Sequence, residues 1–209
     1  MGVITKIEDQ KNKKRFNIFV DDAFFCGLIK EVAVLANLKV GKEVDEKELN
    51  QLIFDSEVKM AFEKASSYLA SREHSKKELF DKLLKKGYQK EVITAAIEKL
   101  EEYHYVDDEL FAEQFVTQNT KYSKMVLEGK LRQKGVSNEI IKQVLGDGDD
   151  ETEFELCKKQ ARKYIGSKDM TKEGAKDKLI ASLLRKGFKI NTIKQAIKEF
   201  LFDNDVDFD

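Results

Sequence analysis

The stretch LLKKGYQKEVI at residues 83–93 is echoed twice further along the chain, as RQKGVSNEII at residues 132–141 and as LRKGFKINTI at residues 184–193. Each copy contains a lysine, then a glycine, then a hydrophobic residue. The three glycines are Gly87, Gly135 and Gly187. They are separated by 48 and 52 residues, and recurrence at near-regular intervals indicates a repeated structural unit.

Hydrophobic residues recur at fixed distances from each glycine. Leucines stand eight and four residues before it, which places them on one face of a helix that ends near the glycine. The glycine suits the left-handed position after a helix C-terminus, and the preceding lysine complements the helix dipole. The hydrophobic residue after the glycine and an isoleucine six residues after it predict a hydrophobic staple in the next helix. These residues are Leu79, Leu83, Tyr88 and Ile93; Leu127, Leu131, Val136 and Ile141; Leu179, Leu183, Phe188 and Ile193.

A further amphipathic helix is predicted ahead of each helix pair, beginning near Asp55, Asp107 and Phe154. A capping box, SKKE at residues 75–78, marks the second helix of the first unit. The sequence therefore predicts a mainly α protein with three tandem three-helix repeats of helix-turn-helix-like layout, at residues 55–106, 107–146 and 152–202. Stacking of such repeats predicts an elongated curved array.

Residues 1–54 have a different pattern. The segments VITKI and RFNIFVDDAFFCGLI are rich in β-branched and aromatic residues, and Asp21-Asp22 stands where a hairpin turn is expected. Short helices are predicted at about residues 29–38 and 45–53. We therefore expect a small N-terminal subdomain that contains a β-hairpin.

Composition excludes several classes of protein. Charged residues make up 37% of the 209, yet the formal net charge is −1, and the chain has no proline to interrupt a helix. Two cysteines are too few for a disulfide framework. No segment has a signal-peptide pattern or the roughly 18 apolar residues of a membrane span. We expect a soluble cytoplasmic protein with no membrane association.

Charge is segregated along the chain. Residues 156–200 carry thirteen basic and four acidic residues, whereas residues 143–155 carry six acidic residues and no basic one. Residues 147–151 are interpreted as an acidic linker, and residues 203–209 as an acidic tail or the start of a further linker. Three consecutive hydrophobic residues at 200–202 predict that Leu201 or Phe202 packs outside the third repeat, or that the natural protein continues beyond it.

The search for catalytic chemistry finds no constellation. Phosphate-binding glycine motifs are absent from the sequence, and neither histidine has a cysteine at metal-ligand spacing. His74 is interpreted as a solvated loop residue, and His104 ends a helix. Cys26 is expected in the core and Cys157 half-buried. Tyr103, Tyr105, Phe111 and Phe115 could form a base-stacking platform, but helical spacing favours core positions. We expect no catalytic residue, metal or cofactor.

Basic residues are the remaining candidates for a binding surface. A solvated helix face explains any one cluster, but recurrence in three stacked units favours a partly basic stripe for contact with a partner or DNA. The candidates are Arg72, Lys76, Lys77, Lys85 and Lys86 in the first unit, Lys130, Arg132 and Lys134 in the second, and Lys158, Lys159, Arg162, Lys163, Arg185 and Lys186 in the third.

Longer segments resemble a known family. The segment from YLASREHSKKEL to YVDDELFAEQFV at residues 68–116 is similar to the first repeat and following junction of RecX, a regulator of the bacterial RecA recombinase. The segments GKLRQKGVSNEIIKQVL and LIASLLRKGFKINTIKQAI resemble its second and third repeats. The N-terminal segment resembles the extension of RecX proteins of Gram-positive type. Tyr103-His104 departs from the family, which usually has a glycine at this junction.

The resemblance implies a function that composition does not indicate. RecX proteins bind the RecA–DNA filament and restrain its ATPase, strand exchange and growth in recombination, DNA repair and the SOS response. It implies a monomeric, non-catalytic protein whose partners are the RecA filament and the DNA within it, with weak binding of free DNA. The alternative is a helical-repeat DNA-binding protein that acts primarily through phosphate contacts.

Overall fold

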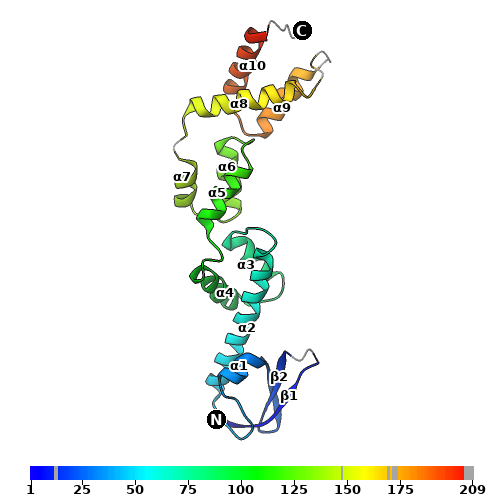
Figure 1. Cartoon of the computed structure of the whole chain (residues 1–209), viewed down its shortest axis with the longest axis vertical. Helices are drawn as coiled ribbons and strands as arrows, with labels where there is room; N and C mark the ends of the chain where they lie inside the picture. Colours follow the sequence, from blue (N-terminus) through cyan, green and yellow to red (C-terminus); the bar gives the residue numbers. More distant parts are fainter. Residues whose placement is uncertain (12–13, 147, 169, 171–173, 205–209) are drawn as a thin grey trace. The chain divides into compact units, whose positions relative to one another are not determined.

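The computed structural model describes residues 1–11, 14–146, 148–168, 170 and 174–204, with the side chains described as far as residue 199. It divides into two compact units, residues 1–106 and residues 107–209 (Figure 1). The expected tail at residues 203–209 falls outside the described residues from 205 onward, and the side chains of Leu201 and Phe202 also fall outside them.

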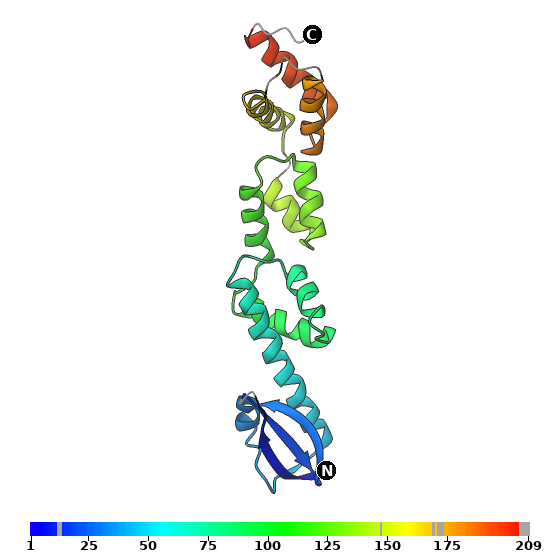
Figure 2. The same cartoon turned by 90° about the vertical axis from the view of Figure 1, so that its right-hand side faces the viewer.

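The N-terminal subdomain is a four-stranded antiparallel sheet with strand order β3-β2-β1-β4 (Figure 2). Its strands are β1 (Gly2–Asp9), β2 (Arg15–Val20), β3 (Ala23–Ile29) and β4 (Glu43–Val44). Asp21 and Asp22 connect β2 to β3 with φ values of 49° and 65°, the left-handed pair that a tight hairpin turn requires. The predicted hairpin is therefore confirmed, within a sheet larger than the sequence indicated.

A single long helix, α2 (Glu46–Leu69), joins this sheet to the first repeat, after the short helix α1 (Lys30–Leu35). Two helices were expected here, near residues 45–53 and 55–70. Helix α2 is continuous because no glycine or proline interrupts it and because both of its halves bury apolar residues. Leu49 packs in the core of the sheet, whereas Val58, Ala61 and Ala65 pack in the core of the first repeat.

The first repeat consists of the C-terminal half of α2 with α3 (Lys76–Leu84) and α4 (Lys90–Glu102). Ser75 caps α3 by accepting a hydrogen bond from the Glu78 N–H at 3.2 Å, as the capping box predicts. The core of the repeat contains Leu79, Leu83 and Ile93, all fully buried.

The second unit contains two further three-helix repeats. The second repeat is α5 (Asp108–Gln118), α6 (Lys124–Gln133) and α7 (Asn138–Leu145), and the third is α8 (Asp150–Ile165), α9 (Ala175–Arg185) and α10 (Ile190–Asn204). Each has its own hydrophobic core. Together with the first repeat and the sheet, they confirm the mainly α fold with three tandem three-helix repeats.

The acidic run assigned to a linker lies partly at the start of α8, and Asp147 lies outside the described residues. Asp149 is the N-cap of α8 and accepts a hydrogen bond from the Thr152 N–H at 2.5 Å. Asp150 and Glu151 lie in the first turn. Carboxylates are favourable there because they satisfy unpaired N–H groups and oppose the positive end of the helix dipole.

The three repeated glycines have φ values of 89° (Gly87), 83° (Gly135) and 91° (Gly187), as predicted. In each turn the hydrophobic residue after the glycine donates its N–H to the carbonyl of the leucine five residues earlier, at 3.1–3.4 Å. The glycine N–H binds the carbonyl three residues before it. These two hydrogen bonds form a Schellman motif. The motif requires a left-handed backbone conformation, which glycine adopts without strain.

The predicted hydrophobic staple is present in all three repeats. Tyr88 packs in one core with Ile93, Val136 with Ile141, and Phe188 with Ile193. Gln89 and Ser137 are the N-caps of the helices that follow the first two turns. The hydrophobic residue after each glycine thus fixes the direction in which the next helix starts.

The glycine turn of the third repeat also contacts the second repeat. The Lys186 carbonyl accepts a hydrogen bond of 2.8 Å from the N–H of Ser123, which caps α6. A Cβ atom on Gly187 would lie 2.3 Å from the Ser123 Oγ and 2.4 Å from a Val126 methyl group. By contrast, a Cβ atom on Gly87 would meet nothing within 4 Å. Gly187 therefore has two functions, the left-handed turn and the close contact with α6.

His74 is buried, which corrects the expectation of a solvated loop residue. Its side chain is 1% exposed, and its Nδ1 lies 2.9 Å from the Arg72 carbonyl oxygen. A carbonyl only accepts, so Nδ1 carries the proton and Nε2 is the unprotonated nitrogen. Nε2 is buried with no partner among the described residues. Burial lowers the pKa of this imidazole below its usual 6.5, because the charged form would lose hydration.

The two roles of Gly187 predict unequal effects of alanine at equivalent turns. Gly87→Ala should lower the free energy of unfolding by about 1–2 kcal/mol through left-handed strain alone. Gly187→Ala should cost about 1–3 kcal/mol more, because the new methyl group overlaps Ser123 and Val126. Urea denaturation followed by circular dichroism measures both. Equal costs for the two variants would contradict the second role.

The buried imidazole predicts a loss of stability in mild acid. Because the pKa of His74 is lower in the folded chain than in the unfolded one, the unfolded chain binds more protons as the pH falls through 6.5. Stability should therefore decrease between about pH 7 and pH 5.5. His74→Asn retains an N–H donor without titrating and should flatten this dependence, measured as the melting temperature across the range. The control His104→Asn, at the exposed histidine, should leave it unchanged; flattening by the control instead would refute the assignment.

Candidate functional site

Some of the basic candidate residues form ion pairs with acidic residues of the same chain, and others do not. In the first repeat, Arg72 pairs with Glu78 at 3.1 Å, and Lys76 pairs with Glu101 at 2.8 Å. Both pairs are at the surface, so each contributes little to stability, but each directs a cation onto a neighbouring carboxylate. These two residues are less available to a partner than their sequence positions indicated.

Basic side chains of the second unit also have partners within the chain. Lys158 lies 2.8 Å from the Glu155 carboxylate and 2.6 Å from that of Glu199, and its side chain is only 13% exposed. The hydrogen bonds that Lys158 donates to these two carboxylates raise its pKa above the ordinary value for lysine. Arg132 donates to the Asn138 side chain at 3.0 Å. Lys158 therefore links α8 to α10.

The lysines that precede the three glycines have three different environments. Lys86 is exposed. Lys134 lies over the rings of Phe111 and Phe115, at 5.5 and 5.4 Å from their centroids. Lys186 donates a 2.8 Å hydrogen bond to the buried Gln160. Burial lowers the pKa of Lys186, and the nearby cations of Lys163 and Lys121 lower it further. The repeated sequence thus predicts the turn but not the environment of the lysine.

A second group of candidates is exposed to solvent. Within the described ranges, no side chain forms an ion pair or hydrogen bond with any of its members. The group comprises Lys85, Lys86, Lys159, Lys163 and Arg185, and it is called the free basic group below. Lys77 and Arg162 are also exposed, but both have further contacts within the chain.

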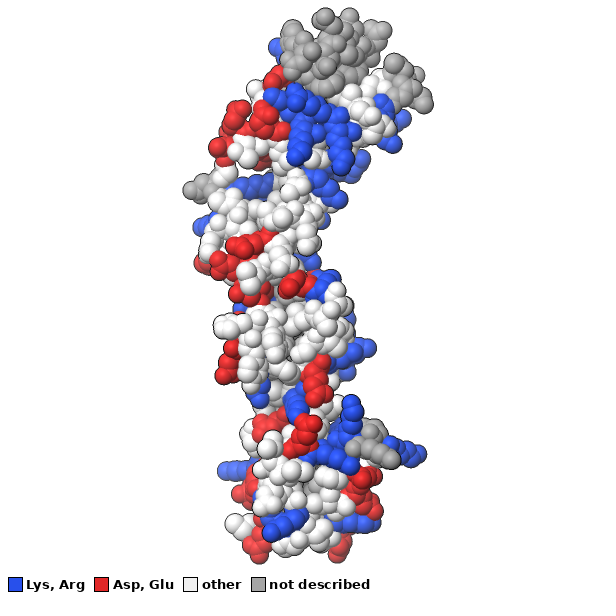
Figure 3. Space-filling model, viewed as in Figure 1, with Lys and Arg blue, Asp and Glu red and all other residues white. Residues whose placement is uncertain are grey.

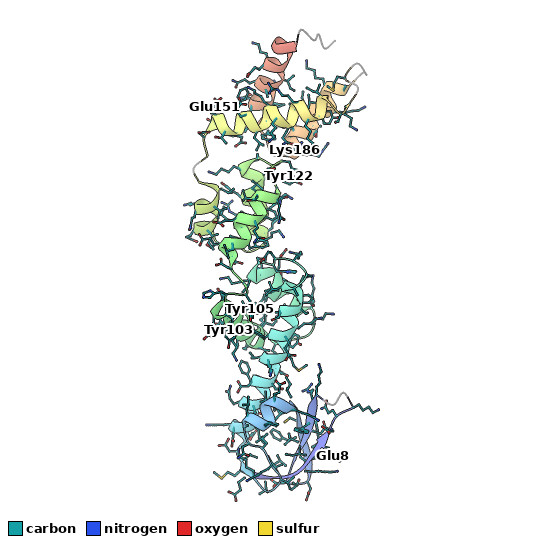
Figure 4. All side chains as sticks on the ribbon, viewed as in Figure 1. Glu8, Tyr103, Tyr105, Tyr122, Glu151 and Lys186 are labelled. Carbon is teal, nitrogen blue, oxygen red and sulfur yellow. The ribbon has the colours of Figure 1, made fainter. Side chains whose placement is uncertain are left out.

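Basic side chains gather over α8 and the helix ends next to it, whereas acidic side chains gather at the N-terminal end of α8 (Figure 3). Glu151 lies at the acidic end (Figure 4). This segregation stabilises the helix, since each charge opposes the nearer end of the helix dipole. The same arrangement also leaves Lys159 and Lys163 on a locally positive surface that can bind phosphate groups or a carboxylate-rich protein segment.

Two residues of this surface were not identified from the sequence. Lys121 and Tyr122 lie just before α6, and Figure 4 shows Tyr122 beside Lys186. Lys121 and Lys130 lie over the Tyr122 ring, at 5.1 and 4.8 Å from its centroid. The signal that could have found them is the serine that follows: Ser123 caps α6 as Ser75 caps α3, so both loops hold equivalent positions in their repeats.

The four aromatic candidates separate into two pairs. Phe111 is buried, and Phe115 packs against the same core, as expected. Tyr103 and Tyr105 are 59% and 58% exposed, which contradicts the expectation that they lie in the core. They follow the end of α4, where the helical spacing that predicted burial no longer applies.

No group that could perform catalysis stands out in the described parts of the chain. Among these residues, no three His, Cys, Asp or Glu side chains are close enough together to hold a metal ion. Both cysteines are buried, and burial raises the pKa of each thiol to about 11, which keeps it protonated and unreactive. Cys157 is fully buried rather than half-buried, because it packs in the core of the third repeat.

No described helix combines the length and the apolar character needed to cross a lipid bilayer.

Family profiles match four consecutive segments of the chain. The profile of the regulatory protein RecX N-terminal domain matches residues 2–45, and those of the first, second and third three-helix domains of RecX match residues 61–100, 107–145 and 151–197.

Curated relatives and solved structures agree with these matches. Regulatory protein RecX of Bacillus licheniformis is 35% identical over 98% of this chain and 80% of its own length. That of Clostridioides difficile is 34% identical over 96% and 97%. A crystal structure of regulatory protein RecX superposes with a TM-score of 0.65 at 25% identity over 93% of this chain and all of its own. RecX from Lactobacillus salivarius gives 0.54 at 26% identity over 68% and 96%. With its sheet and all three helical repeats matched in order, this chain belongs to the RecX family of regulatory proteins.

Proposed function

We propose that this protein is a negative regulator of RecA that binds the RecA–DNA filament and restrains its ATPase, strand exchange and growth. The observation that carries the proposal is the match of the N-terminal domain and all three repeats to RecX over residues 2–197. The protein acts in the cytoplasm as a monomer and performs no catalysis of its own.

The free basic group supports a role in binding. Lys85 and Lys86 lie at the end of α3 in the first repeat, whereas Lys159, Lys163 and Arg185 lie on α8 and α9 in the third. An exposed cation without an internal partner loses no intramolecular contact when it binds a phosphate or a carboxylate. These five residues are therefore the proposed contacts with the filament, in preference to the occupied Arg72, Lys76 and Lys158.

The positive surface around α8 favours a second candidate function, direct binding of DNA through its phosphates. The two functions differ in their dependence on salt and on RecA. Phosphate binding without RecA should weaken steeply with salt concentration, because each neutralised phosphate releases counterions. Regulation of the filament requires inhibition that depends on RecA, with weak binding of free DNA.

The direct test is the DNA-dependent ATPase of RecA, measured over a range of concentrations of this protein. We expect the ATPase to be inhibited at concentrations that produce no shift of free single-stranded DNA in a mobility assay. Inhibition that appears only where free DNA is already saturated would support the alternative function. An unchanged ATPase at every concentration would refute the proposal.

Variants of the free basic group locate the contact. Neutralising Lys159 and Lys163 together to Gln should raise the concentration for half-maximal inhibition roughly five- to tenfold, because two interfacial charges are lost. The matched control is Lys39→Gln with Lys47→Gln, two exposed lysines of the N-terminal part that lie outside the repeats. Equal inhibition by both double variants would show that the surface on α8 is not the contact.

A further inference from the structure

Three aromatic rings form an exposed cluster on the first unit. Tyr103 and Tyr105 lie beside each other next to α4 (Figure 4), with ring centroids 6.0 Å apart. Both contact Phe62 of α2, at centroid distances of 6.0 and 6.2 Å. Phe62 is partly buried beneath them. These three residues are called the aromatic patch below.

The backbone holds the two tyrosines in place. His104, between them, has a φ of 56°, a left-handed conformation that is strained for a residue with a side chain. The Tyr105 N–H binds the Leu100 carbonyl at 2.8 Å, and the His104 N–H binds that of Glu101 at 2.9 Å. This is the same closure as at the three glycine turns. The turn therefore fixes both tyrosines on the surface instead of leaving them on a loose loop.

Several aromatic rings elsewhere in the described chain have a lysine over them. A lysine lies 4.5–5.5 Å from the centroid of seven other rings: Phe16, Phe19, Tyr68, Phe111, Phe115, Tyr122 and Phe154. In the described parts of the chain, no lysine or arginine lies over the rings of the aromatic patch. Its exposed π-faces are therefore available to a cation from another molecule.

Carboxylates surround this part of the chain. Residues 98–108 contain five acidic residues and one lysine, Lys99. Glu101 pairs with Lys76, but Glu98 and Glu102 are exposed, and no ion pair engages either of them within the described residues. They stand four residues apart on α4 and so share one helix face. The negative charge would repel a phosphate backbone and attract a basic side chain.

We infer that the aromatic patch, with Glu98 and Glu102, receives an arginine side chain from a basic segment of a partner protein. Arginine fits better than lysine because its planar guanidinium stacks on a tyrosine ring and donates to carboxylates at its edge. The inference deepens the proposed function, and rests on it only in taking RecA as the protein that presents the arginine. It also separates two surfaces: the aromatic patch binds a basic protein segment, and the free basic group binds acidic groups.

The first experiment uses the whole chain without RecA. The protein, with 13C-labelled tyrosine rings, is titrated by NMR with the peptide acetyl-Gly-Arg-Gly-amide, and separately with the lysine peptide and with a thymidine oligonucleotide. The Tyr103 and Tyr105 ring signals, assigned from single Tyr→Phe variants, should shift most with the arginine peptide and least with the oligonucleotide. Larger shifts with the oligonucleotide would instead identify a base-stacking platform. No shift with any of the three probes would also overturn the inference.

Two double variants separate the contributions. Tyr103→Leu with Tyr105→Leu keeps apolar bulk but removes both exposed tyrosine faces, and should weaken peptide binding at least about fivefold. Glu98→Gln with Glu102→Gln should weaken it roughly threefold or more. The matched control, Glu43→Gln with Glu46→Gln, removes two exposed carboxylates of the same unit and should have no effect. Unchanged binding by the leucine variant would mean that apolar contact alone explains the patch, which contradicts the inference.

The second experiment measures binding to the RecA–DNA filament by co-sedimentation. The leucine variant should bind about fivefold more weakly than the natural sequence while its circular dichroism and melting temperature are unchanged. Full binding by this variant would refute the patch as a filament contact even if the peptide binds. If the natural chain binds no filament, the proposed function fails, while the peptide titration still decides whether the patch accepts arginine.

Discussion

The architecture of the three repeats depends on a helix C-terminus that is closed by a residue in the left-handed conformation. At each of the three glycine turns, two backbone hydrogen bonds close the end of one helix, and the next residue enters the core and starts the following helix. A residue with a side chain at this position would strain the turn, and it would also change the direction of the second helix. Helices α4, α7 and α10 therefore each start from a direction set by a single glycine.

Much of the fold is predictable from this local chemistry. The distances between leucine, glycine and isoleucine predict both helices of each pair, and Asp21-Asp22 predicts the hairpin. The continuity of α2 was not predictable in the same way, because its two halves bury different residues against different cores. The role of the acidic residues before α8 was missed for another reason. An N-cap and first turn are as acidic as a solvated linker, so composition alone does not distinguish them.

The sequence predicts which basic residues are candidates for binding, but not which of them are free to bind. Lysine precedes all three glycines, but its partner is solvent in one repeat, two phenylalanine rings in the next and a buried glutamine in the third. Those partners come from other helices, and so the repeat pattern carries no information about them. Likewise, Tyr103 and Tyr105 lie at the surface because α4 ends at residue 102. Hydrophobic periodicity does not define the last residue of a helix closely enough to predict this. Contacts between helices decide which side chains remain free for a partner.

The proposed contacts with the filament are the exposed lysines that form no ion pair or side-chain hydrogen bond within the described residues. Lysine acetylation by acetic anhydride, quantified by mass spectrometry with and without the RecA–DNA filament, measures this at each position in the natural chain. We expect Lys159 and Lys163 to react readily in the free protein and to be protected in the complex, whereas Lys39 and Lys47 should react equally in both. Protection of Lys39 and Lys47, with Lys159 and Lys163 unaffected by the filament, would contradict it.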